Sequence, residues 1–372
     1  MPPDDNANFN AIDPFLIDGH KIDYHPQRVA LWLTKPSEVF PIYVEVSPVG
    51  QCNHRCTFCA VDYIGYVNRR LEPTRFQEVL DDMARSGIRS IMYAGEGEPM
   101  LHPEINRLVY DTARAGIDMA FTTNGTRLDE RFVEESLDKV KWIKVSINAG
   151  DRETYAKIHQ TKERDWERVW GNLRNAISGR GNRRVSSKVS TVIGAQTVVL
   201  PDNIKSLEGL IQKSVDVGLD YCVLKPYSQH KMSITKTYEE VRYDDQIKEL
   251  GGLAEKYSTE KFKVVCRSHA MQTAGEAQPY HKCQATPYFW AYIMADGEVY
   301  GCSAYLLDKR FRYGNINDKL FSEIWLGAER RESIRYVNEE LDITECRKNC
   351  RMDKVNRYLW GLKNPNPHVN FI

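Results

Sequence analysis

The chain has 372 residues, enough to bury a large core and to form two domains. Its 51 basic and 51 acidic side chains cancel, so net charge gives no sign of nucleic acid or an anionic membrane as a partner. No stretch approaches the roughly 18 apolar residues of a membrane span. The first residues, MPPDDNANFN, lack the basic and apolar blocks of a signal peptide. Nine cysteines without an export signal favour reduced thiols, metal chemistry and a cytoplasmic location.

From residue 42 onward, short apolar runs alternate with longer amphipathic ones, which predicts a parallel sheet with right-handed crossovers. This pattern alone does not separate a doubly wound sheet from a barrel. The strands are expected at Ile42–Ser47, Ser90–Ala94, Asp118–Thr122, Trp142–Ile147, Lys188–Ile193 and Tyr221–Leu224. The helices are expected at Arg75–Ser86, Pro103–Ala115, Asp129–Leu137, Trp166–Ser178, Asn203–Val217 and Tyr243–Tyr257.

The loop after the first expected strand contains the run CNHRCTFC, with Cys52, Cys56 and Cys59 at the spacing C-x3-C-x2-C. Three such thiols can hold three irons of a four-iron cluster and leave the fourth iron open for a ligand. The alternatives are a zinc site or buried thiols. Zinc would need a fourth ligand, for which His54 is the only close candidate, at a spacing unlike that of zinc fingers. The spacing therefore favours an iron-sulfur cluster.

Glycine-rich and polar segments follow the other expected strands. They are Gly95–Pro99, Thr123–Thr126, the pair Ser146 and Asn148, Gly194–Gln196 and Lys225–His230. In parallel α/β folds the carboxyl ends of the strands meet at one edge, where the chemistry is placed. We therefore expect these segments to share one site with the cysteine loop.

The last third carries a second set of cysteines, namely Cys283, Cys302, Cys346 and Cys350. The segment Phe289–Cys302, FWAYIMADGEVYGC, predicts a β-hairpin around Asp296 and Gly297. A hairpin can bring the first two cysteines to one metal centre, and the later pair can close it from a loop or helix end. Four thiols saturate an iron-sulfur cluster, although structural zinc uses the same ligands.

The cysteine loop resembles that of the radical S-adenosylmethionine (SAM) superfamily, and Gly97–Pro99 resembles the end of that family's GGEP segment. This implies a partial (β/α)6 barrel whose 4Fe-4S cluster cleaves SAM reductively to a 5′-deoxyadenosyl radical. The second cysteine set and Gly314–Trp325 (GNINDKLFSEIW) resemble the Twitch form of the SPASM domain, a small α+β domain with one auxiliary 4Fe-4S cluster. The implied division is an extension at 1–41, a barrel at 42–260 and an auxiliary domain at 261–372.

The same resemblance assigns residues to SAM. The glycine loop and Glu98 are expected to accept hydrogen bonds from the SAM amino group, although Glu96 stands where the family usually has glycine. Phe58 is expected near the adenine, and an ordinary Asn-Gly turn is the alternative for Asn124. The full expected set is Phe58, Gly95, Glu96, Gly97, Glu98, Asn124, Ser146 and Gln196.

The implied chemistry is hydrogen abstraction from a substrate carbon, with electrons from a flavodoxin- or ferredoxin-type reductant. An auxiliary cluster could accept the electron left on the substrate, completing a two-electron oxidation as in Twitch-containing aminocyclitol dehydrogenases. A small polar substrate such as a sugar or aminocyclitol fits the short segment before the first strand. The alternatives are a peptide maturase or epimerase of the same superfamily and a non-catalytic zinc adaptor. Candidates for proton or hydrogen transfer are Lys225, Tyr227, His230 and Cys266.

Overall fold

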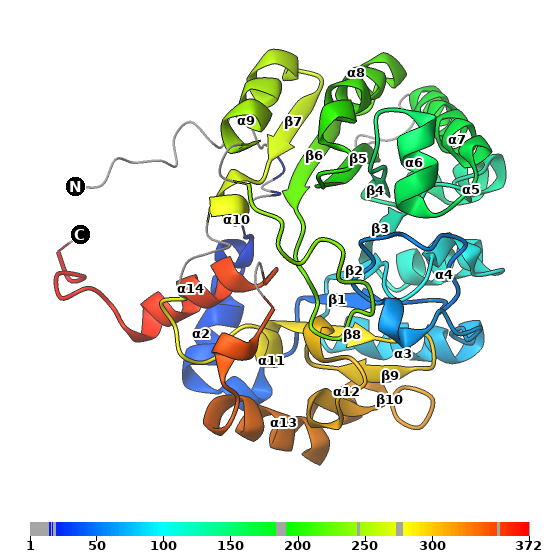
Figure 1. Cartoon of the computed structure of the whole chain (residues 1–372). Helices are drawn as coiled ribbons and strands as arrows, with labels where there is room; N and C mark the ends of the chain where they lie inside the picture. Colours follow the sequence, from blue (N-terminus) through cyan, green and yellow to red (C-terminus); the bar gives the residue numbers. More distant parts are fainter. Residues whose placement is uncertain are drawn as a thin grey trace.

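Figure 1 shows the computed structural model of the chain, which describes residues 15, 17, 20–183, 191–243, 246–272, 278–347 and 350–371. Within these residues, ten strands form one sheet in the order β10-β9-β8-β1-β2-β3-β4-β5-β6-β7. Seven strands run parallel in chain order from β1 to β7. The strands are β1 (Tyr43–Val46), β2 (Ser90–Tyr93), β3 (Asp118–Thr123), β4 (Trp142–Ser146), β5 (Val192–Val199), β6 (Tyr221–Pro226), β7 (Lys263–Cys266), β8 (Trp290–Ile293), β9 (Glu298–Tyr300) and β10 (Arg312–Asn315).

Helices follow most of the parallel strands and cover one face of the sheet (Figure 1). Ile143 and Val145 of β4 are fully buried in the core between the sheet and these helices, whereas the alternate residues of β4 are only half-buried. Alternation along the strand therefore places Lys144 and Ser146 on the inner face of the open barrel. The α-helices are α2 (Pro26–Thr34), α3 (Pro73–Arg85), α4 (Ile105–Arg114), α5 (Glu130–Glu135), α6 (Arg152–His159), α7 (Glu163–Arg183), α8 (Leu207–Val217), α9 (Gln246–Tyr257), α10 (Ser268–Gln272), α11 (Thr286–Phe289), α12 (Phe321–Trp325), α13 (Ala328–Glu339) and α14 (Asp353–Lys363).

Two short helices between strands, α5 and α6, start at capping side chains. Asp129 accepts a hydrogen bond from the backbone N–H of Phe132 at the start of α5 (3.0 Å), and Asp151 does so from Thr154 at the start of α6 (2.8 Å). The sequence prediction included α5 but missed α6. The cap at Asp151 is the signal that could have revealed α6.

The fifth strand differs from its prediction. It starts at Val192 and continues to Val199, so Gly194 and Gln196 lie inside the strand rather than in a loop. Residues 188–190 of the predicted strand lie outside the described residues. A Cβ on Gly194 would approach the ring of Tyr221 in β6 to under 3.0 Å. This glycine therefore marks close packing between strands, not the end of a strand.

The cysteine-rich part of the chain continues the barrel sheet. β8 and β9 form the predicted hairpin, in which Gly297 adopts a positive φ of 87°. β8 also pairs in parallel with β1, with Tyr43 opposite Trp290. The α/β architecture predicted from the sequence is confirmed, and the two parts share one ladder of strands. The division of the chain at residue 260 stays a prediction. None of the described helices is long and apolar enough to cross a membrane.

Candidate active site

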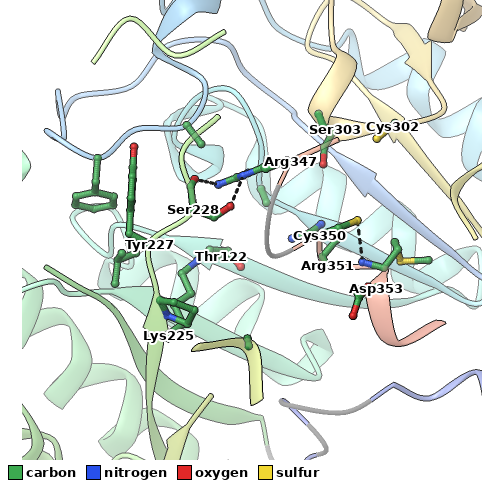
Figure 2. Close-up of a pocket in the computed structure, with 18 of the residues that line it drawn as sticks. Thr122, Lys225, Tyr227, Ser228, Cys302, Ser303, Arg347, Cys350, Arg351 and Asp353 are labelled. Atoms are coloured by element: carbon green, nitrogen blue, oxygen red, sulfur yellow. Dashed lines mark hydrogen bonds between the residues drawn. The ribbon is translucent and has the colours of Figure 1, made fainter. Parts of the chain in front are cut away.

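One cavity of about 810 Å³ reaches both sets of cysteines. Its wall includes all three thiols of the CNHRCTFC loop, and Figure 2 shows another part of the wall. That part contains Cys302 after the hairpin and Cys350 before α14. Segments separated by about two-thirds of the sequence therefore enclose one space.

The first three thiols are half-buried and lie close enough to repel one another when charged. Burial raises the pKa of Cys52 to about 12, and Glu98 and Cys59 add to this effect. Burial also raises the pKa of Cys56 well above its usual value, again with contributions from Cys59 and Cys52. Such thiols lose their protons only when a cation takes up the charge, as bound metal does. This donor set fits an iron-sulfur cluster.

His159, at the end of α6, donates a hydrogen bond to one of these thiols. Its Nε2 accepts the backbone N–H of Asn148 (3.2 Å), and burial lowers the pKa of the ring well below its usual value. A neutral imidazole has one proton, which must then lie on Nδ1. Nδ1 is 3.3 Å from Cys56 Sγ. Sequence reasoning missed His159 because it missed α6.

Three possible metal ligands, including this ring, lie close together beside the cysteine loop. His54, Cys56 and His159 each place one ligand atom within 4.8 Å of the others. His54 is 1% exposed, and among the described residues neither of its ring nitrogens has a hydrogen-bond partner. Zinc would need a lone pair on Nδ1 of His159, but the contact with Asn148 leaves the proton on that nitrogen, so the ring suits a role beside a cluster.

The loop after β2 lies directly against the cysteine loop. The backbone N–H of Glu98 donates to the carbonyl of Gln51 (2.8 Å). A Cβ on Gly97 would come within 3.0 Å of the carbonyl oxygens of Gln51 and Val49. Glycine is therefore required here because two backbones meet. Gly95, with φ of 116°, and Gly97 both line the cavity.

The side chain of Glu98 binds mainly to the protein. Its carboxylate accepts hydrogen bonds from Thr123 Oγ1 (2.5 Å), the backbone N–H of Asn124 (2.6 Å) and that of Met100 (3.1 Å). Burial raises the pKa of Glu98 to about 7, although these three bonds act in the opposite direction. Glu98 lines the cavity and connects the loop after β2 to the loop after β3.

Three more residues of the expected SAM set also line the cavity, namely Phe58, Asn124 and Ser146. The Asn124 side chain donates to Asn53 Oδ1 (2.8 Å) and accepts from the backbone N–H of Thr126 (3.0 Å). Asn124 thus also makes the local turn that was the alternative interpretation. The contact of Asn124 with SAM stays a prediction.

Glu96 and Gln196 lie outside the cavity lining. One carboxylate oxygen of Glu96 pairs with Arg69 (2.6 Å), and the other accepts the backbone N–H of Ala295 (2.8 Å). Glu96 therefore connects the loop after β2 to the β8–β9 turn. Gln196 lies opposite Ser146 in the β4–β5 ladder, but only Ser146 lines the cavity.

The second set of thiols is held by hydrogen bonds that suit bound metal. The buried Oδ1 of Asn356 accepts the backbone N–H groups of Gln284 (2.7 Å) and Ala285 (3.0 Å), which directs its Nδ2 toward Cys283 Sγ (3.6 Å). The backbone N–H of Met352 donates to Cys350 Sγ (3.4 Å). Donors to sulfur stabilise thiolates and tune cluster potentials.

These four thiols also lie near one another. Burial raises the pKa of Cys302 well above its usual value, with further contributions from Cys350, Cys283 and Cys346. Burial raises the pKa of Cys350 to about 12, and Cys283 and Cys346 add to it. Four such thiols can saturate a four-iron cluster.

Of the four proposed transfer residues, two face the cavity. Lys225 and Tyr227 line it, whereas His230 and Cys266 do not. The ring of His230 stacks on Tyr63 with a centroid distance of 5.0 Å, and burial lowers its pKa to about 4. Cys266 ends β7 and packs against the main core. Burial raises the pKa of Tyr227 to about 12.

Comparison with known proteins identifies the family. The model of the radical SAM superfamily matches residues 46–220, and that of the SPASM iron-sulfur cluster-binding domain matches residues 283–351. The chain is a radical SAM protein with a SPASM domain. The radical SAM domain implies a 4Fe-4S cluster and SAM, and the SPASM domain implies auxiliary iron-sulfur chemistry.

Relatives of this radical SAM protein catalyse different reactions. A GTP 3′,8-cyclase of Chlorobaculum tepidum is 29% identical over 51% of this chain and 56% of its own length. A protein of Pyrococcus furiosus that modifies the cofactor of tungsten-containing aldehyde ferredoxin oxidoreductase is 22% identical over 82% of this chain and 85% of its own length. The crystal structure of Streptococcus suis SuiB bound to its precursor peptide SuiA has a TM-score of 0.61, with 16% identity over 93% of this chain and 78% of that one. The chain spans about half the length of the cyclase, and the likeness to SuiB shows the fold alone.

Sequence reasoning also missed the arginines of the cavity wall. Arg347 and Arg351 each directly follow a cysteine of the second set, in the run CRKNCR. Both line the cavity of this radical SAM protein, together with Arg267 after β7. The repeated Cys-Arg pair was a signal that could have revealed the first two arginines.

Replacing His159 by phenylalanine is expected to lower the reduction potential of the cluster at Cys56. The loss of one N–H···S bond, about 0.5–1.5 kcal/mol, corresponds to roughly 20–65 mV for a one-electron couple. A potentiometric titration followed by EPR measures the shift. His159→Gln, which keeps an N–H donor, should lie nearer the wild type. An unchanged reduction potential in His159→Phe would show that the hydrogen bond from His159 to Cys56 does not affect the cluster.

Proposed function

We propose that this radical SAM protein abstracts a hydrogen atom from a small polar substrate and completes a two-electron oxidation. The observation that carries the proposal is the single cavity that both cysteine sets line. Its volume of about 810 Å³ lies within the range of small-molecule sites, about 300–1,000 Å³. A substrate bound there would lie between a source of radicals and an electron acceptor.

The chain's own residues supply the two metal sites and the walls. Cys52, Cys56 and Cys59 would hold the SAM-binding cluster, and the second set would hold one auxiliary cluster. When bound, the first cluster and SAM supply the hydrogen-abstracting radical, and the auxiliary cluster takes up one electron. Glu98 keeps the loops after β2 and β3 together, and His159 orients the Cys56 thiol. Lys225 and Tyr227 are the predicted transfer residues that line the cavity.

Peptide modification is the second candidate, because the SuiB structure with its precursor peptide covers 93% of this chain. The name of the cyclase supports the first candidate, since GTP is a small molecule. The cytoplasmic location and a flavodoxin- or ferredoxin-type reductant stay predictions.

Anaerobic incubation with SAM and dithionite tests the proposal. The wild type should form 5′-deoxyadenosine, and a Cys52→Ala/Cys56→Ala/Cys59→Ala variant should form none. Adding the small-molecule fraction of a cell extract should increase 5′-deoxyadenosine and yield a product that lacks two hydrogens. Stimulation by the peptide fraction alone would favour the second candidate. No 5′-deoxyadenosine from iron-loaded wild type would refute both.

A further inference from the structure

The cavity wall has more cationic side chains than carboxylates. Its carboxylates are Glu98 and Asp353. Its cations are Lys225, Arg267, Arg347, Arg351, Lys354 and Arg357. The chain as a whole is electrically neutral, so this excess is local. Charges of one sign in a cavity with walls of low dielectric constant attract a ligand of the opposite sign.

Two arginines of this wall form ion pairs with carboxylates. Arg351 forms an ion pair with Glu45, a buried residue of β1. Arg357 pairs with Asp353, with 2.7 Å between Nε and Oδ2. These pairs fix both arginines and leave their charges balanced. The contacts of Lys225 and Arg347 differ from these ion pairs.

Arg347 is held in place by uncharged acceptors. Its Nε–H donates to Ser228 Oγ (3.0 Å) and its Nη2–H to the Ser228 carbonyl (2.6 Å), as Figure 2 shows. These bonds use two of the five N–H donors of a guanidinium and neutralise none of its charge. An arginine fixed in this way is preorganised to present its remaining donors to a planar or tetrahedral anion.

Lys225 approaches the same space from the barrel. It lies near the end of β6, three residues before Ser228, and its side chain is drawn on the cavity wall in Figure 2. Burial lowers its pKa to about 7, and the neighbouring charges that lower it further are Lys144, Arg267, Arg347 and Arg351. Like charges gathered around one ammonium are unfavourable until an anion joins them.

We propose that Lys225 and Arg347 form an anion-binding subsite, and that the substrate of the proposed oxidation carries a phosphate group there. A doubly charged phosphate suits several cations better than one carboxylate does. The inference rests on the proposed function for the substrate's role, but not for the binding itself. It disfavours an aminocyclitol, whose ammonium groups would meet the same cations, and leaves a phosphorylated sugar within the predicted class.

A competing role for Arg347 is to offset the negative charge of the thiolates beside it, because it follows Cys346. Lys225 separates the two roles, since it lies on a barrel strand away from both cysteine sets in the sequence. An anion subsite needs both residues, whereas charge compensation at the second cysteine set needs only Arg347.

Calorimetric titration of pyrophosphate into the anaerobically reconstituted protein with SAM tests the subsite. Arg347→Gln and Lys225→Gln should each weaken pyrophosphate binding by about tenfold or more. Lys35→Gln removes the same charge from an exposed side chain and should leave the affinity unchanged. Arg347→Lys keeps the charge but loses the planar fork and should give an intermediate affinity.

Equal pyrophosphate affinity in all four variants would overturn the proposal. So would an Arg347→Gln variant whose auxiliary EPR signal shifts while its pyrophosphate affinity stays at the wild-type value. Iron content and SAM cleavage are measured on the same samples. Binding that depends on Lys225 and Arg347 in a protein that cleaves no SAM would support the subsite and refute the proposed function. Intact SAM cleavage without pyrophosphate binding that depends on Lys225 and Arg347 would support the proposed function and refute the subsite.

Discussion

A Cys346→Ala/Cys350→Ala variant is expected to cleave SAM but to lose substrate oxidation. The two thiols belong to the set that raises the pKa of Cys302, and they line the cavity across from the CNHRCTFC loop. Removing them takes two of four ligands from the auxiliary site and none from the SAM site. We expect iron to fall by about four atoms per chain. Product formation should fall on the order of 100-fold or more, about 3 kcal/mol in activation free energy.

Two assays on one preparation compare SAM cleavage with substrate oxidation. They measure the amounts of 5′-deoxyadenosine and of oxidised product. Cys222→Ala is the matched control, because that thiol is fully buried in β6 and belongs to neither set. The control should keep its iron and both activities. A Cys346→Ala/Cys350→Ala variant that still oxidises substrate at the wild-type rate would show that the second set does not accept the electron.

Gly97→Ala is expected to damage the SAM site. The new Cβ would lie within 3.0 Å of the backbone carbonyls of Gln51 and Val49, so one of the two loops must move. Overpacking of this kind costs about 1–3 kcal/mol. Here the displaced backbone is directly followed by Cys52. We therefore expect SAM affinity to fall by about tenfold or more, with partial loss of the first cluster.

Gly171→Ala provides the control for this substitution. Gly171 lies in α7, and a Cβ there meets no atom within 4 Å. Alanine in a helix is about 1 kcal/mol more favourable than glycine, so Gly171→Ala should keep SAM affinity and raise the melting temperature slightly. Calorimetry with SAM and thermal unfolding compare the two variants. Equal SAM affinity in both would contradict the role given to the contact at Gly97.

The sequence allowed prediction of features that depend on local spacing. The alternation of strands and helices predicted the α/β architecture, and Asp296-Gly297 predicted the β8–β9 hairpin. The pairing of β8 with β1 joins residues about 250 positions apart, and no local pattern specifies it. Gly194 was misinterpreted because a glycine that makes room for Tyr221 looks the same in sequence as one that ends a strand.

The site was predicted where a residue's neighbours are close in sequence. The loop residues Gly97 and Glu98 do lie on the cavity wall, but the partner of Glu96 is Arg69 together with the backbone of the hairpin. The role proposed for the Arg347 charge depends on Lys225, which lies more than 100 residues earlier in the chain. Long-range contacts of this kind decide which polar side chains face a ligand.

Iron, sulfide and zinc content of anaerobically purified protein, with EPR before and after SAM addition, tests the central claim most directly. The account predicts about eight irons per chain and a reduced-cluster signal that changes when SAM binds. About four irons with one zinc would keep radical chemistry but remove the auxiliary electron acceptor, and with it the proposed oxidation. Zinc alone, found reproducibly without exposure to oxygen, would contradict the account.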